Sequence, residues 1–446
     1  MTEHAFPRSY KTKYIEADHG DGIYIYDTKG KRYIDGCCGA LVSNLGHNNS
    51  EIITAIKSQY DKIEFAHPSR WHCNIVEEAA TAVAETAPGD LDKVWFVSGG
   101  SEAVESAVKL SRQYYVERDG ISTSKSITIG RWNSYHGSTL GTMSISGSMA
   151  KRRIFTPLFK ESPKAEPPYC YRCPFYAEYP SCSMACAKNL EHMIRVIGPQ
   201  YITSFIAEPV SGSMVGAVVP PDEYWPMVRD ICTKYDILLI ADEVMSGCGR
   251  TGKNFAIEHW NVVPDMIATA KGLAAGYVPT GGIVVRNGIA DTIKSGSGSF
   301  MHGHTYNGNP VSAAAVCAVF KYMKEHEIVE NTVAMGKLLE AGLKKIATEN
   351  AIVGDVRGKG LMWGIELVCE KSTKKPFAQK ATASALAGVL CAEKGVIVYP
   401  GSGQIDGHEG DTFLVAPPLI INEDQVDELL EKLSEGLALT AKELLK

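Results

Sequence analysis

Two ionisable side chains stand at the ends of apolar runs that are typical of buried strands. Residues 239–241 read Leu-Ile-Ala and lead into Asp242 and Glu243, and residues 266–270 read Met-Ile-Ala-Thr-Ala and lead into Lys271. Ligands in open α/β sheets bind beyond the carboxyl ends of the strands. The lysine and the aspartate, 29 positions apart (271 minus 242), are therefore predicted to meet at one edge of a sheet. Either residue alone would more usually be a loop cap or a solvated side chain.

A lysine and a carboxylate in this arrangement suit one cofactor in particular. Pyridoxal phosphate forms an imine between its aldehyde and a lysine, and it needs an acidic group beside its pyridine nitrogen so that the protonated ring accepts electrons. Lys271 is the candidate for the first role and Asp242 for the second. The pair therefore predicts a pyridoxal phosphate site.

Two further motifs fit the remaining parts of that cofactor. Ser98-Gly99-Gly100-Ser101 is a glycine-rich turn between a strand pattern and a helix pattern, where exposed amides and the positive end of a helix favour a phosphate. Tyr135, followed by His136 and Gly137, offers an aromatic ring to lie against the cofactor. Each motif alone is a weak signal, because such turns and buried aromatic residues are common.

Together these residues resemble the class III aminotransferases, the ω-amino-acid branch of the fold type I pyridoxal phosphate enzymes, over nearly the whole chain. The pattern that carries the resemblance is long and has few chance matches. It runs through Asp242-Glu243-Val244, Gly247-Cys248-Gly249-Arg250-Thr251-Gly252, Pro264-Asp265 and Ala270-Lys271-Gly272.

The resemblance assigns roles to individual residues. It implies a ring stacked between Tyr135 and Val244, a Glu-Pro-Val turn at Glu208 near the substrate, and Thr305 reaching the cofactor phosphate of the neighbouring subunit. The family works as a dimer with shared sites, so we expect a homodimer or a tetramer built from it. The expected catalytic residues are Lys271 and Asp242, and the expected cofactor-binding residues are Gly100, Ser101, Tyr135, His136, Glu208, Asp242, Val244, Lys271 and Thr305.

The implied reaction is transamination by a ping-pong mechanism through a Lys271 aldimine. An amine donor displaces Lys271, whose freed amine can then act as the general base that moves a proton from the substrate carbon to the cofactor. A keto acid then accepts the amino group. The motifs around Lys271 do not separate this enzyme from an aminomutase, epimerase or decarboxylase of the same fold, and a non-catalytic protein that binds the cofactor is a further alternative.

The substrate is less well defined than the cofactor. Many members that process ornithine or 4-aminobutyrate have glutamine after Asp-Glu-Val, where this chain has Met245. An apolar residue there favours an ω-amino acid or amine donor with pyruvate as acceptor. Two positions where relatives can carry a carboxylate-binding arginine are Tyr399 and Leu414, so we consider Arg172 and Arg70 as replacements. The donor itself stays open.

A cluster of cysteines raises the question of a metal. The spacing of Cys170, Cys173, Cys182 and Cys186 is compatible with a four-thiolate zinc site that would staple a loop. Cysteines with such a spacing are more usually reduced thiols that pack in the wall of a pocket. We therefore predict no metal and keep zinc as the minor alternative.

The element pattern predicts an α/β fold with two unequal parts. Apolar runs at residues 94–97, 204–207, 237–240, 266–268 and 283–285 alternate with helix patterns such as 103–115 and 224–234, which favours a mainly parallel sheet. Longer amphipathic segments at 328–349 and 381–394 predict a smaller α+β domain. We expect an N-terminal segment (1–55) that packs with the small domain, a large cofactor-binding domain (56–325) and a small C-terminal domain (326–446).

Composition narrows the class of protein. The chain has 446 residues, 45% of them hydrophobic, and a net charge of −6 from 45 basic and 51 acidic residues, without the basic stripe that nucleic-acid binding needs. No apolar stretch suits a signal peptide or a membrane span. The twelve cysteines include the adjacent Cys37 and Cys38 and suggest reduced thiols. We expect a cytoplasmic enzyme whose partners are a small amine donor and a keto acid, with no nucleic acid and no membrane.

Overall fold

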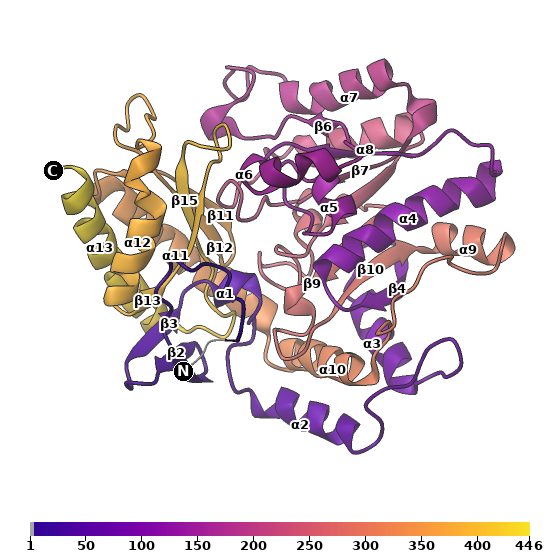
Figure 1. Cartoon of the computed structure of the whole chain (residues 1–446), viewed down its shortest axis with the longest axis horizontal. Coiled ribbons are helices and arrows are strands. Elements are labelled where there is room, and N and C mark those ends of the chain that lie inside the picture. Colours follow the sequence, from indigo (N-terminus) through magenta and orange to yellow (C-terminus); the bar gives the residue numbers. More distant parts are fainter. Residues whose placement is uncertain (1–3) are drawn as a thin grey trace.

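A seven-stranded sheet lies at the centre of the larger part of the molecule (Figure 1). The computed structural model of the protein describes residues 4–446, and in that part of the chain the strands form three sheets. The large sheet has the order β4 (Leu91–Val97), β10 (Gly281–Arg286), β9 (Met266–Ala270), β8 (Leu238–Asp242), β7 (Ile202–Ala207), β5 (Ile127–Arg131) and β6 (Lys164–Ala165).

The large sheet is parallel except for one strand. β8 pairs in parallel with β7 and β9, and β5 pairs in parallel with β6 and β7. β10 is antiparallel to both of its neighbours, β9 and β4. The mainly parallel sheet is therefore confirmed, and residues 283–285 lie in its one antiparallel strand, a direction that the apolar run did not indicate. Since the connection from β9 spans only residues 271–280, it holds no crossover helix and the chain turns straight back.

Helices cover both faces of this sheet. Phe205 and Leu239 belong to one apolar cluster while their chain neighbours Ile206 and Ile240 belong to another, because successive residues of a strand point to opposite faces. The mostly apolar sequences of β7 and β8 follow from burial on both sides. The helices are α4 (Gly100–Asp119) and α9 (Asn287–Ser295) on one face, and α7 (Ala185–Ile197) and α8 (Tyr224–Lys234) on the other.

One of the two smaller sheets joins the ends of the chain. The N-terminal strands pair as an antiparallel meander, and the last of them lies parallel to a short strand from the C-terminal part (Figure 1). One sheet contains β1 (Ala17–Asp21), β2 (Tyr24–Asp27), β3 (Arg32–Asp35) and β13 (Val396–Ile397), and the other contains β11 (Val353–Lys359), β12 (Met362–Leu367), β15 (Asp411–Val415) and β14 (Tyr399–Ser402).

The remaining helices are divided between the large sheet and the two smaller ones. None of the helices within residues 4–446 has the length and apolar composition needed to cross a membrane. Their bounds are α1 (Cys38–Leu41), α2 (Ser50–Tyr60), α3 (Asn74–Ala84), α5 (Leu140–Ile145), α6 (Met149–Arg152), α10 (Pro310–Glu325), α11 (Ile328–Glu349), α12 (Ala383–Glu393) and α13 (Glu423–Leu444).

The sequence patterns predict the bounds of the longer helices correctly, except for the start of α4. α8 and α11 have the bounds that periodicity predicts. α4 begins at Gly100, three residues before the predicted start. Gly100 and Ser101 are therefore in the first helical turn, where backbone N–H groups have no partner within the helix. This shift places the predicted phosphate loop on the helix end itself.

Candidate active site

The predicted functional side chains gather at the carboxyl edge of the parallel strands. With the exception of Thr305, all of them line one cavity of about 410 Å³, a size typical of small-molecule sites, which span roughly 300–1,000 Å³. Each comes from the end of a different strand or the loop that follows it. Gly100 and Ser101 follow β4, Tyr135 and His136 follow β5, Glu208 follows β7, Asp242 ends β8 just before Val244, and Lys271 follows β9.

Lys271 opens the connection between β9 and β10 with its backbone in the left-handed region, at a φ of 49°. Burial lowers the pKa of its amine to about 8, an effect that Asp242 opposes and that the charge of Lys151 reinforces. The neutral amine is the nucleophilic form of lysine. Burial thus prepares Lys271 to attack an aldehyde near neutral pH.

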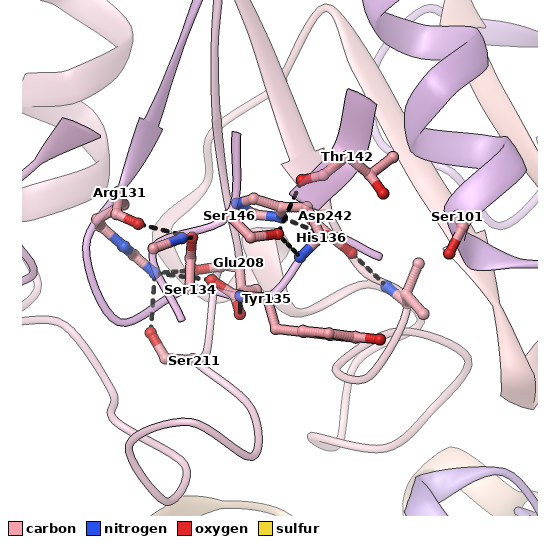
Figure 2. A network of polar contacts seen from close by, with 12 residues as sticks. Ser101, Arg131, Ser134, Tyr135, His136, Thr142, Ser146, Glu208, Ser211 and Asp242 are labelled. Carbon is pink, nitrogen blue, oxygen red and sulfur yellow. Dashed lines mark hydrogen bonds and ion pairs between the residues drawn. The ribbon is translucent and has the colours of Figure 1, made fainter. Parts of the chain in front are cut away.

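Asp242 is held from two sides. Its Oδ2 lies 2.7 Å from Nδ1 of His136 and its Oδ1 accepts a hydrogen bond of 3.1 Å from the Val244 N–H. A carboxylate only accepts hydrogen bonds, so Nδ1 of His136 is assigned as the donor. Both side chains are almost fully buried, with 3% and 2% of their surfaces exposed. Figure 2 shows them side by side. The pair therefore presents a fixed carboxylate to the cavity.

A second buried network holds the tyrosine loop in place. Oε1 of Glu208 accepts a hydrogen bond of 3.1 Å from the Tyr135 N–H. Arg131 donates from Nη2 to the Glu208 carbonyl at 2.9 Å and to Ser211 Oγ at 2.8 Å (Figure 2). Arg131 is 1% exposed. Because it ends β5, it ties the loop after β5 to the loop after β7 and so sets the position of the Tyr135 ring.

The other end of the cavity is built to receive an anion. The first turn of α4 contains Gly100 and Ser101, and Ser101 Oγ accepts a hydrogen bond of 3.1 Å from the Ser138 N–H. A Cβ on Gly137 would lie 2.6 Å from that same oxygen, and Gly137 has a φ of 137°. Glycine is thus required where the two loops meet. The positive end of this long helix favours a phosphate at the junction.

The cavity fits pyridoxal phosphate part by part. It offers a reactive amine from Lys271, a carboxylate from Asp242 for the ring nitrogen, and the end of α4 for the phosphate. Tyr135 and Val244, which were predicted to enclose the ring, both line it. Nε2 of His136 is buried without a hydrogen-bond partner among the described residues. This donor set has the chemistry of the cofactor that the sequence predicts.

One predicted site residue lies outside the cavity, and several residues that line the cavity were not predicted. Thr305 is exposed and outside the cavity lining. Val42, Val278 and Thr280 add to the lining, although no motif marked them. Glycine and proline between residues 276 and 279 were the available signal for a turn beside Lys271.

The positions that could bind a substrate carboxylate take different roles. Tyr399 and Leu414 are cross-strand partners in β14 and β15, so neither supplies a cation. Nε of Arg172 pairs at 2.5 Å with the fully buried Glu366, which also lies 2.9 Å from Nη2 of Arg357. Arg172 is therefore engaged in a structural network and does not support the hypothesis that it clamps the acceptor.

Arg70 offers no better support. Its side chain is exposed and lines a separate hollow with Trp71 and His72, away from the Lys271 cavity. Met245, in contrast, lines that cavity next to Val244. The wall of the substrate space is thus apolar at the position where some relatives carry glutamine.

The structure gives no support to a metal site at the cysteine cluster. Within residues 4–446, no group of three or more His, Cys, Asp or Glu side chains is arranged to hold a metal ion. Cys170 is exposed, whereas burial raises the pKa of the Cys186 thiol to about 11, which keeps it protonated. The zinc alternative for Cys170, Cys173, Cys182 and Cys186 is therefore not supported.

The fold and the site together define a fold type I enzyme that uses pyridoxal phosphate. Comparison with known proteins agrees with this class. The chain is 39% identical to YodT, an uncharacterised aminotransferase of Bacillus subtilis, over 100% of both chains. It is 35% identical to a putrescine–pyruvate aminotransferase of Pseudomonas aeruginosa, over 94% of this chain and 90% of that protein.

Solved structures show the same likeness. A transaminase from the marine bacterium Virgibacillus superposes with a TM-score of 0.91 at 34% identity, over 99% of this chain and 98% of that one. An amine transaminase from an uncultivated Pseudomonas species, solved with pyridoxal phosphate bound, gives a TM-score of 0.91 at 32% identity, over 98% and 99%. Residues 5–437 match the class-III aminotransferase family. The chain belongs to that family.

Proposed function

We propose that this enzyme transfers an amino group from an ω-amino acid or amine to a keto acid, with pyruvate as the acceptor. The observation that carries the proposal is the meeting of Lys271, Asp242 and the end of α4 in one cavity whose adjoining wall is the apolar Met245. A relative named putrescine–pyruvate aminotransferase, similar along nearly the whole chain, supports the same class of donor and acceptor.

The residues divide the work between them. Pyridoxal phosphate supplies an electron-accepting ring that stabilises negative charge on the substrate carbon. Lys271 would hold the cofactor through its aldehyde, and its amine, when free, would move a proton to and from the substrate carbon. Asp242 would keep the ring nitrogen of the cofactor protonated, and His136 fixes this carboxylate through the 2.7 Å hydrogen bond. Glu208 and Arg131 hold the loop that places Tyr135 in the cavity wall.

We also propose that the enzyme is a homodimer, alone or as half of a tetramer. Exposed aromatic and apolar side chains gather beside the cavity, where Tyr60 and Tyr306 line a second hollow that shares Ser98 and Val278 with the first. Thr305 adjoins Tyr306 and is free to reach a neighbouring subunit. Sedimentation of the purified enzyme tests this proposal, because Tyr306→Arg should shift the dimer toward a slower-sedimenting monomer.

The division into an N-terminal segment (1–55), a large domain (56–325) and a small domain (326–446) remains our proposal for the organisation of the chain. The parallel pairing of β3 with β13 supports the joining of the first segment to the last. A cytoplasmic location is proposed with it, in keeping with cysteines that are unpaired in the described structure.

The visible spectrum of the purified holoenzyme tests the proposed reaction. The absorption band of the lysine-bound cofactor should disappear when ω-amino acids or amines are added without an acceptor, and pyruvate should restore it. Lys271→Ala is the control, since it should show neither change. If a product forms from the amine without consumption of a keto acid, the enzyme is a mutase, epimerase or decarboxylase and not a transaminase. A band that no donor alters would favour a non-catalytic protein.

A further inference from the structure

Arg250 carries a guanidinium group that is buried where three segments of the chain meet. The residue has 0% of its surface exposed. Nη1 donates hydrogen bonds to the carbonyls of Leu361 at 3.1 Å and Pro417 at 2.6 Å. Nη2 donates to Oδ1 of Asn44 at 2.7 Å and to Sγ of Cys38 at 3.4 Å. Arg250 therefore joins the loop after β8 to the N-terminal segment and to two separate parts of the C-terminal region.

The four acceptors of this guanidinium are neutral, although buried charges in proteins are usually paired with an opposite charge. Hydrogen bonds from a charged donor are stronger than those between neutral groups. The N–H groups of arginine point outward in a rigid, planar fork, so the charge is satisfied only when all acceptors lie at the ends of that fork. Arg250 thus fixes the position of the three segments relative to one another.

Asn44 carries this constraint to the connection that begins at Lys271. The residue is 2% exposed, and its Nδ2 donates a hydrogen bond of 3.2 Å to the Cys248 carbonyl. A Cβ on Gly272 would lie only 2.3 Å from the same Nδ2. The amide of Asn44 therefore packs directly against the residue that follows Lys271, so closely that only glycine fits there.

A second contact supports the later part of the connection. A Cβ on Gly276 would lie 3.1 Å from Cγ1 of Val42, and Val42 and Gly276 both line the cavity that contains Lys271. The N-terminal segment therefore contacts the connection between β9 and β10 at Gly272 and again at Gly276. Arg250 holds this segment from its other side.

The connection needs such support because its backbone is strained at the reactive residue. Lys271 has a φ of 49°, in the left-handed region that side chains seldom adopt. A strained conformation of this kind persists only where the surrounding structure enforces it. The position of a reactive group also matters for rate, because a displacement of about 1 Å can slow a reaction about 100-fold.

From this arrangement we propose that Arg250 is a positioning residue for the reaction. Through Asn44, it holds the backbone of Lys271 in the conformation from which the lysine amine moves a proton to and from the substrate carbon. Arg250 lies outside the cavity lining, so it acts through Asn44 and not on the substrate. The assignment rests on the proposed role of Lys271. Loss of Arg250 should slow the proton transfer and leave the binding of the acceptor nearly unchanged.

The test follows a single turnover, so that only folded and loaded sites are counted. Enzyme loaded with pyridoxamine phosphate is mixed with pyruvate, and the return of the absorption band of the lysine-bound cofactor is recorded. At saturating pyruvate, the rate constant should fall about 10-fold in Asn44→Ala and about 10- to 100-fold in Arg250→Met, as expected for a displaced reactive group. The pyruvate concentration at half-saturation should stay within about twofold of the wild type, since a misplaced lysine alters the chemical step and not the binding of the acceptor. The double variant should be no slower than Arg250→Met, because both substitutions break the same link.

Arg112→Met is the matched control. Arg112 also donates from Nη1 to backbone carbonyls, those of Thr123 and Lys125, but these lie beyond the far end of α4. Its loss should lower the denaturant concentration at which the enzyme unfolds, as the loss of Arg250 should, without changing the single-turnover rate constant. The control therefore separates a loss of stability from a loss of position.

Hydrogen exchange of the holoenzyme gives a readout that does not depend on turnover. The N–H groups of Ala275 and Tyr277 form hydrogen bonds within the connection, so their exchange reports on its local opening. Exchange in residues 271–280 should be about 10-fold faster in Asn44→Ala and in Arg250→Met than in the wild type, and unchanged in Arg112→Met.

Two results would overturn the proposal. One is an Asn44→Ala enzyme with the single-turnover rate constant and the exchange of the wild type. The other is an Arg112→Met enzyme that is slowed as much as Arg250→Met. A wild-type enzyme whose loaded form does not respond to pyruvate would instead refute the proposed acceptor, and the exchange measurement would still decide the role of Arg250.

Discussion

The neutral amine of Lys271 predicts how the capture of the cofactor depends on pH. The pKa of this amine is lowered from 10.5 to about 8 by burial. At pH 7 about one molecule in ten then has the neutral amine, against about one in 3,000 for an ordinary lysine. Capture of pyridoxal phosphate by the cofactor-free enzyme should therefore be about 300-fold faster at pH 7 than a solvated lysine would allow. Its rate should rise with pH and level off above about pH 8.

Stopped-flow absorbance of the cofactor-free enzyme mixed with pyridoxal phosphate measures this rate between pH 6 and 10. A small lysine derivative in solution is the control, because it corrects for ionisation of the cofactor itself. Two variants should move the midpoint in opposite directions, since Asp242 raises the pKa of Lys271 and Lys151 lowers it. Asp242→Asn should shift the midpoint below that of the wild type and Lys151→Met above it. A rate that keeps rising to pH 10 in the wild type would refute the argument from burial.

Three further substitutions test other parts of the site and the fold. His136→Phe removes the 2.7 Å hydrogen bond to Asp242 and should lower kcat about 10- to 100-fold with the cofactor still bound, as steady-state rates and the visible spectrum would show. Gly100→Ala places a Cβ 2.9 Å from Val244. It should weaken cofactor retention on dialysis and cost about 1–3 kcal/mol of unfolding free energy. Glu366→Gln leaves the half-buried Arg172 and Arg357 without their shared, fully buried carboxylate and should cost about 3–5 kcal/mol in denaturant unfolding; a change below about 1 kcal/mol would contradict that role.

Much of the site was predictable because each of its main residues is marked by its immediate neighbours in the sequence. Lys271 and Asp242 stand directly after apolar strands, and the rule that ligands lie at the carboxyl ends of parallel strands brings them together. The Gly100 turn was recognisable for a similar reason, although its helix starts earlier than periodicity predicts.

The missed features depend on contacts between distant segments. Arg131 and Glu208 are 77 positions apart and meet only because β5 and β7 are neighbours. Arg172 reads as a free surface cation until β12 places Glu366 against it. The reversed direction of β10 was missed because an apolar run indicates a buried strand but not its direction.

The reversed β10 has a consequence for how such an enzyme can diversify. The reactive lysine stands at the first position of a connection of only ten residues, anchored at both ends by the paired strands β9 and β10. The same connection supplies Val278 and Thr280 to the cavity wall. An insertion there would displace the nucleophile along with the wall. New substrate ranges are therefore more readily gained by changes in segments far from Lys271 in the chain, such as the residues around Val42, which also lines the cavity, and libraries for altered specificity should leave residues 271–280 intact.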